Sequence, residues 1–82
     1  MEIQTICEMM QYEHNHLDYR YTIKATIKLS NDESILVDYE DLTIISEEKV
    51  LQVRYRGEYR TIYFEDIKDF QYQVVKSDYY YG

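Results

Sequence analysis

The sequence predicts a mainly β domain of the α+β type: a small antiparallel sheet of five to six strands, curved or closed into a barrel, with a short N-terminal helix. Three observations support this prediction. Short stretches of alternating apolar and polar residues are separated by polar turns. Eleven tyrosines favour strands, in which aromatic residues are enriched. A length of 82 residues leaves room for one hydrophobic core, so residues 1–82 are expected to form a single domain.

The N-terminal segment, residues 1–18, fits either a helix or a strand, and its apolar spacing favours the helix. Four apolar residues follow the i, i+3, i+4, i+7 pattern of one helical face: Ile3, Ile6, Cys7 and Met10. A strand through residues 1–9 is the alternative. We predict a short helix here.

Residues 19–75 carry the predicted β-structure, which begins with a hairpin. Apolar and polar residues alternate from 19 to 29, as in a strand with one buried face. The polar stretch 30–34 predicts a turn. Residues 35–39 then form the returning strand, and the acidic pair after them interrupts the pattern.

A second hairpin is the most clearly predicted part of the chain. It follows a strand at 42–45 and a polar turn at 46–49. Its strands are residues 50–56 and 59–64, and Gly57-Glu58 is predicted to join them tightly because such turns need positive φ.

The last predicted elements are one helical or 3₁₀ turn and a strand. The turn covers residues 65–68 and the strand residues 69–75, with its apolar side chains on one face. The tail, residues 76–82, shows no periodicity and is expected to be loose.

Charge and composition narrow the classes of function. Nine Lys and Arg against sixteen Asp and Glu give a net charge of −7, which keeps a small domain soluble and disfavours direct binding of nucleic acid. No apolar run approaches the ~20 residues that span a bilayer, so no membrane partner is expected. The N-terminus does not resemble a secretory signal, and Cys7 is the only cysteine. A cytoplasmic protein is therefore expected.

The sequence contains no recognisable catalytic or cofactor-binding set. Cys7 has no basic neighbour that would lower the pKa of its thiol, and a single internal glycine excludes a glycine-rich phosphate loop. His14 and His16 could bind a metal with Cys7 or Glu13, but a closed site needs four ligands. We expect no enzyme, no cofactor and no metal, and interpret the histidines as part of a solvated loop.

The second hairpin has the residue types of a binding site at its tip. Three arginines and two tyrosines lie close together there: Arg54, Tyr55, Arg56, Tyr59 and Arg60. Arginine with tyrosine is typical of protein interfaces and also of single-strand nucleic-acid sites. Because the net charge is −7, we expect a partner protein in preference to nucleic acid.

Acidic residues form a second candidate surface, consisting of Asp38, Glu40, Glu65, Asp66 and Asp69. Neighbouring acids on a strand edge usually only increase solubility. However, alternate strand residues lie ~6.6–6.8 Å apart, close to the spacing of phosphates along a DNA strand. An acidic rim could therefore imitate nucleic acid and occupy a basic groove on another protein.

Residues 42–71 resemble the C-terminal β-region of the YolD-like proteins, small proteins of Firmicutes and their phages. That family ends this region with a phrase like I-P-F-E-D-I-I-D, and residues 62–69 read Ile-Tyr-Phe-Glu-Asp-Ile-Lys-Asp. Tyr63 replaces the proline, and the helical N-terminal segment of the family is largely missing. The stretch is also similar to the Sm-like barrel of WYL domains. The resemblance implies a small SH3- or Sm-like barrel and a link to nucleic-acid machinery.

These features lead to two hypotheses of function. The first is a non-enzymatic inhibitor or adaptor, of phage or mobile-element type, that binds a host protein of nucleic-acid metabolism, with nucleic-acid mimicry as one mechanism. The alternative is a YolD-like accessory or regulatory protein that contacts nucleic acid through Arg54, Arg56 and Arg60. An open edge on the last strand and exposed tyrosines would also support a homodimer.

Overall fold

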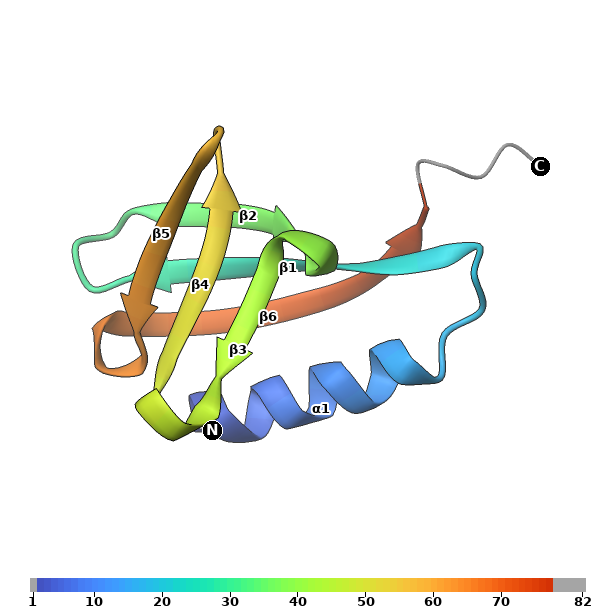
Figure 1. The fold of residues 1–82 in the computed structure, drawn as a ribbon, viewed down its shortest axis with the longest axis horizontal. Helices are drawn as coiled ribbons and strands as arrows, with labels where there is room; N and C mark the ends of the chain where they lie inside the picture. The colour runs from blue at the N-terminus through green and yellow to red at the C-terminus, as the bar shows by residue number, and fades with distance from the viewer. Residues whose placement is uncertain (1, 78–82) are drawn as a thin grey trace.

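The computed structural model describes residues 2–77, and its six strands form two antiparallel sheets that lie one in front of the other (Figure 1). The first sheet has the order β2-β1-β6, from Ser34–Asp38, Tyr21–Leu29 and Ile67–Lys76. The second has the order β3-β4-β5, from Leu42–Ile45, Val50–Tyr55 and Glu58–Tyr63. One helix, α1, spans Ile3–Asn15. The structure confirms the predicted mainly β fold with a short N-terminal helix.

The central strand of the first sheet, β1, has the predicted alternation. Ile23, Ala25 and Ile27 are fully buried, while the residues between them face away from the core. β1 pairs with β2 in the predicted hairpin, and its other edge pairs along its whole length with β6. Near the end of this ladder the partners step from Lys28↔Asp69 to Leu29↔Ile67, so β6 contains one extra residue there.

The predicted hairpin of β4 and β5 is present, but its turn is one residue earlier than predicted. Tyr55 pairs with Glu58, which leaves Arg56 and Gly57 as the two turn residues. Their φ angles are +53° and +80°, and a tight turn with positive φ at both central positions suits the right-handed twist of the strands. The prediction Gly57-Glu58 was wrong because Arg56 was assigned to the strand.

The chain crosses between the two sheets twice, each time through a short 3₁₀ helix. The first, η1, covers Tyr39–Asp41 between β2 and β3, and the second, η3, covers Phe64–Asp66 between β5 and β6. Both have the sequence aromatic, Glu, Asp, followed by an aliphatic residue. In both, the aromatic side chain packs on the core, and the backbone N–H after the aspartate donates to the aromatic residue's carbonyl.

The two crossings are corresponding parts of an internal repeat. The first unit of the repeat consists of β1, β2, η1 and β3, and the second consists of β4, β5, η3 and β6 in the same order. The last strand of each unit pairs with the first strand of the other, because β3 pairs with β4 and β6 pairs with β1. Neither unit can complete a sheet alone, so the two units depend on each other.

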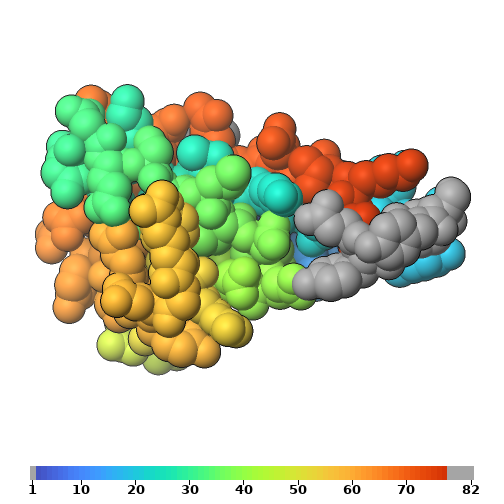
Figure 2. Space-filling view, turned by 90° about the horizontal axis from the view of Figure 1, so that it is seen from above, coloured from blue at the N-terminus to red at the C-terminus, as the bar shows by residue number. Residues whose placement is uncertain are grey.

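The core lies between the two sheets and α1. Figure 2 shows β4 and β5 in one layer and β1 and β6 in the other. α1 runs along the lower side in Figure 1 and contributes Cys7 and Met10, both fully buried. Ile3 and Ile6 pack on the same core, so all four residues of the predicted helical face turn inward.

Two details of the predicted β-structure are settled by the strand pairing. The described strands form two separate sheets, so they do not close into a barrel. β6 continues to Lys76, which pairs with Tyr21, and the Ser77 N–H donates to the Arg20 carbonyl at 2.8 Å. The rest of the expected loose tail lies outside the described residues. Within residues 2–77 no helix has the length and apolar character needed to cross a membrane.

Candidate binding groove at the β4–β5 hairpin

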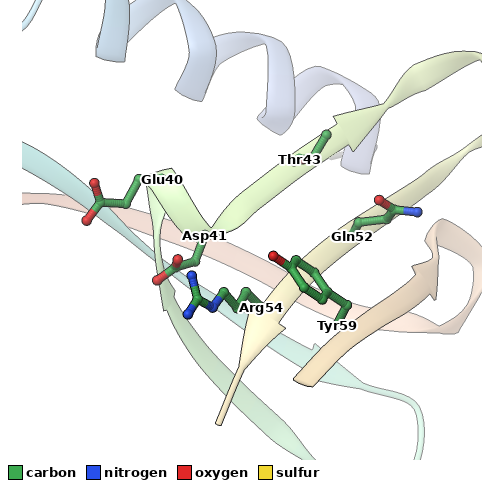
Figure 3. A pocket seen from close by; sticks show the side chains of 6 residues that line it. All are labelled: Glu40, Asp41, Thr43, Gln52, Arg54 and Tyr59. Atoms are coloured by element: carbon green, nitrogen blue, oxygen red, sulfur yellow. The ribbon is translucent and has the colours of Figure 1, made fainter. Parts of the chain in front are cut away.

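A shallow groove with both acidic and basic residues lies between η1 and the β4–β5 hairpin. Its deeper part has a volume of about 240 Å³ and is shown in Figure 3. The residues that line this part are Glu40, Asp41, Thr43, Gln52, Arg54 and Tyr59. A more open part continues over the hairpin turn and adds Asp38, Arg56 and Gly57. We call the two parts together the tip groove.

Strand register places Arg54 and Tyr59 next to each other in the tip groove. They are directly opposite on β4 and β5, on the face of the sheet that points away from the core. Tyr59 is 81% exposed, more than any other large apolar or aromatic side chain among residues 2–77. Figure 3 shows the Arg54 guanidinium directed toward Asp41 and away from the Tyr59 ring. Within residues 2–77 Arg54 has no carboxylate partner at salt-bridge distance.

Arg56 and Tyr55 extend this surface around the hairpin turn. The Arg56 guanidinium carbon lies 5.1 Å from the centre of the Tyr55 ring, which is a cation–π distance. Arg56 itself has positive φ, a conformation that costs a non-glycine residue about 1–2 kcal/mol. The turn therefore displays a cation in a backbone conformation that its side chain does not favour.

Arg60 was predicted to act with the other arginines, and the structure places it on the opposite face of the hairpin. It pairs with Val53, whose side chain is buried in the core. Its guanidinium donates two hydrogen bonds to Glu33, with Nη1–Oε2 at 2.7 Å and Nη2–Oε1 at 3.0 Å. These bonds lower the pKa of the Glu33 carboxyl and raise that of Arg60. Arg60 thus joins the two sheets and is not a residue of the tip groove.

The five predicted acidic residues fall into two groups. Asp38 and Glu40 line the tip groove, and Asp38 also lies 3.8 Å from the Lys24 ammonium. Glu65, Asp66 and Asp69 belong to η3 and β6. Asp38 pairs with Lys24 on one edge of β1, and Asp69 pairs with Lys28 on the other edge. The two acidic groups are therefore separated by about 13 Å along the strands and by about 10 Å across the sheet.

Basic residues lie between the two acidic groups and next to them. Lys24 and Lys28 lie on the strand between the two groups, and Lys68 forms a 3.3 Å salt bridge with Asp32. The carbonyl of Asp66 also accepts hydrogen bonds from the Ser30 N–H and hydroxyl. The structure therefore does not bring the predicted acids together as one continuous rim.

Cys7, His14 and His16, which were considered for catalysis or metal binding from the sequence, are buried in the core or contact other side chains and the backbone. Burial, with a smaller effect of Glu8, raises the pKa of the Cys7 thiol to about 11, so the thiolate is scarce at neutral pH. His14 stacks on Tyr39 with ring centres 3.8 Å apart, and the His16 Nδ1–H donates to the Tyr12 carbonyl at 2.8 Å.

The histidine contacts correct the prediction of a solvated loop. His14 belongs to the last turn of α1 and His16 caps the helix, because the helix runs further than its apolar spacing alone indicates. Within residues 2–77 no three His, Cys, Asp or Glu side chains are arranged to hold a metal ion.

Besides Gly57, which was predicted only as a turn residue, three residues of the tip groove were not predicted from the sequence: Asp41, Thr43 and Gln52. Thr43 and Gln52 could have been found, since they alternate with buried residues on the predicted strands and so share a face with Arg54. Asp41 had no such signal, because its position depends on η1 turning the chain from one sheet to the other.

Comparisons of the chain with protein-family models, with curated proteins and with solved structures find no match. The resemblance of residues 42–71 to YolD-like proteins and Sm-like barrels therefore stays a prediction.

Proposed function

We propose that this chain is a small non-catalytic binding protein, an inhibitor or adaptor, that contacts a partner protein through the tip groove. The observation that carries the proposal is the outward-facing pair of Arg54 and Tyr59. Arginine and tyrosine are enriched among the residues that dominate binding energy in protein interfaces. Here the guanidinium has no salt-bridge partner within residues 2–77, so a partner's carboxylate or carbonyl groups can use its donors.

The surrounding charges favour a protein partner over nucleic acid. Asp38, Glu40 and Asp41 line the same groove as Arg54 and Arg56, so a phosphate bound to either arginine would lie beside carboxylates. A protein surface can present groups of both signs and match this pattern. The narrower proposal, that the partner is a host protein of nucleic-acid metabolism, rests on the family resemblance. A cytoplasmic setting rests on the single cysteine.

Direct contact with nucleic acid is the second candidate function. Arg54, Arg56 and the exposed Tyr59 ring favour it, because single strands bind to cations interleaved with aromatic rings. Arg60 contributes less than expected from the sequence, since its guanidinium is engaged by Glu33.

Affinity capture with matched variants tests the first proposal. The immobilised full chain is exposed to a Gram-positive lysate, and the bound proteins are compared for wild type, Arg54→Ala, Tyr59→Ala and Tyr19→Ala. Tyr19 is 78% exposed and does not line the groove, so it is a matched control for Tyr59. We expect one protein to be retained by wild type and Tyr19→Ala and to be reduced about tenfold or more by the other two changes.

Two results would contradict the proposal. One is a partner retained equally by all four proteins, which would place its contact elsewhere. The other is tight binding of a single-stranded oligonucleotide at low salt that is lost in Arg54→Ala and weakens steeply as salt is added, because that result identifies nucleic acid as the ligand.

A further inference from the structure

A second groove, made of apolar and acidic residues, lies between α1 and β6 and shares no residue with the tip groove. Its volume is about 530 Å³. Four of its lining residues come from α1, one is the residue that caps the helix, and one comes from β6: Glu8, Met9, Tyr12, Glu13, His16 and Tyr72. The first five lie on one side of the helix, because residues four apart follow each other along a helical face. Residues 8, 12 and 16 form one row, and residues 9 and 13 form the row beside it. We call this the helix groove.

The helix groove exposes apolar surface that the core does not use. Met9 is 47% exposed and Tyr12 is 69% exposed, whereas the neighbouring Met10 is fully buried. α1 therefore has one apolar side that packs in the core and a second that faces solvent. Exposed apolar side chains clustered in a concave surface are typical of interaction sites.

Hydrogen bonds and ring stacking hold four of the six lining residues in place. The Tyr72 hydroxyl donates to the Glu13 carboxylate at 2.8 Å, which connects the strand to the helix across the groove. The His16 ring stacks on Tyr12 with centres 4.3 Å apart. Its Nδ1–H also donates to the Tyr12 carbonyl at 2.8 Å. A surface fixed in this way loses little side-chain freedom when a ligand binds.

The charge of the helix groove indicates what can occupy it. Glu8 and Glu13 line it, no lysine or arginine does, and neither glutamate forms a salt bridge within residues 2–77. Tyrosine faces beside carboxylates attract a cation with an apolar stem, as in lysine or arginine side chains. A two-fold dimer through this groove would instead bring the glutamates of two chains together, each chain with net charge −7.

We propose that the helix groove binds a basic amphipathic helical segment of a partner protein. Apolar side chains of that segment pack on Met9, Tyr12 and Tyr72. Lysine or arginine side chains of the same segment pair with Glu8 and Glu13. The groove is separate from the tip groove, so the chain carries two binding surfaces and can connect two partners or hold one partner at two points.

The test uses a labelled peptide of leucine and lysine, amphipathic as a helix and roughly four helical turns long. Binding to the full chain is measured by fluorescence anisotropy, and the site is mapped by NMR amide shifts. Two matched peptides separate the contributions: one has serine in place of leucine, and one has glutamate in place of lysine. We expect the serine peptide to bind about tenfold more weakly and the glutamate peptide to show no binding.

Variants of both grooves locate the site. Met9→Ala and Tyr12→Ala should each weaken binding of the leucine–lysine peptide about tenfold. Glu8→Gln and Glu13→Gln should each weaken it about two- to fivefold and reduce its salt dependence. Tyr59→Ala, in the tip groove, should leave it unchanged. This pattern is independent of the capture experiment, so either proposal can fail without the other.

Three results would overturn the inference. The first is equal binding of the leucine and serine peptides, which would mean general attraction to an acidic protein. The second is an equal loss from Tyr59→Ala and Tyr12→Ala. The third is a dimer in sedimentation equilibrium that Tyr12→Ala abolishes, which would make a second copy the occupant.

Discussion

The role of Arg60 in the structure differs from the role that the sequence predicts for it. In the sequence it belongs to the arginine and tyrosine cluster of the hairpin, but the alternation of β5 turns it toward the first sheet. There it meets Glu33, in the loop between β1 and β2, through two parallel hydrogen bonds. A planar guanidinium fits a carboxylate in this way, so the pair connects the sheets with a defined geometry.

The pair predicts a pH dependence of stability. The hydrogen bonds from Arg60, with the charges of Arg60 and Arg56, hold the pKa of the folded Glu33 carboxyl below its ordinary value of 4.5. A carboxyl whose pKa is lower in the folded than in the unfolded state stabilises the fold at any pH above its pKa in the unfolded state. This stabilisation is lost as the pH falls through the pKa of the folded state. Glu33→Gln should therefore lower the urea midpoint near pH 7, and its difference from wild type should shrink as the pH falls below 4.5.

Two further variants test the origin of that dependence. Arg60→Gln should reproduce the effect of Glu33→Gln, because it removes the same hydrogen bonds. Glu47→Gln is the control, since Glu47 is exposed in the 3₁₀ helix η2, Ser46–Glu48, and has no salt bridge within residues 2–77. A difference between wild type and Glu33→Gln that stays constant with pH would contradict the prediction.

At the scale of elements, the β4–β5 turn needs positive φ at two positions, which Gly57 adopts easily and Arg56 does not. Gly57 has φ +80° and no atom within 4 Å of an added Cβ, so Gly57→Ala is opposed by backbone conformation alone. We expect this change to lower the free energy of unfolding by about 1–2 kcal/mol. Arg56→Asn should raise it by up to about 1 kcal/mol, because asparagine tolerates positive φ. Urea denaturation followed by far-UV circular dichroism measures both.

The Arg56 change also connects stability with the proposed function. If Arg56 is retained for binding despite its backbone strain, Arg56→Asn should weaken capture of the partner while it stabilises the fold. No gain in stability from Arg56→Asn, or a neutral Gly57→Ala, would show that the turn is not strained as described.

Adjacent methionines of α1 provide a test of which helical face supports the fold. Met10 is fully buried in the core, whereas Met9 is half exposed in the helix groove. Met10→Ala should cost about 2–5 kcal/mol, because it leaves a cavity in the core. Met9→Ala should change stability by less than about 0.5 kcal/mol. Equal losses in urea denaturation would mean that the two faces contribute alike.

At the scale of the whole molecule, we expect unfolding in a single transition. The core cluster contains residues of α1 and of both sheets, and each sheet takes strands from both repeat units. Neither sheet keeps its apolar face covered when the other unfolds. Thermal transitions measured by far-UV circular dichroism and by tyrosine fluorescence should therefore coincide. Separate midpoints would contradict this mutual dependence.

The internal repeat was visible in the sequence only in part. The phrase Phe64-Glu65-Asp66-Ile67 carried the resemblance to YolD-like proteins, and Tyr39-Glu40-Asp41-Leu42 repeats its pattern 25 positions earlier. The strands around the two phrases differ in length and side chains, so the repeat has no other clear sequence signal. Its meaning depends on the structure, where both phrases carry the chain from one sheet to the other.

Local patterns determined the elements of this protein and the general location of its candidate site. Apolar alternation with period two identified β1 and the β4–β5 hairpin, and the spacing of Cys7 and Met10 identified α1. The same patterns placed Arg54 and Tyr59 at one hairpin. Periodicity is a local property of the chain, because each strand or helix must turn its apolar side chains to one face.

Only the tertiary structure decided which elements pair and which side chains meet. It formed two sheets in place of a closed barrel, joined Arg60 to Glu33, and separated the acids of η1 from those of η3. It also created the helix groove from Tyr12 and Tyr72, which are sixty positions apart in the chain. Such contacts depend on how whole elements pack, and no short stretch of sequence contains both partners.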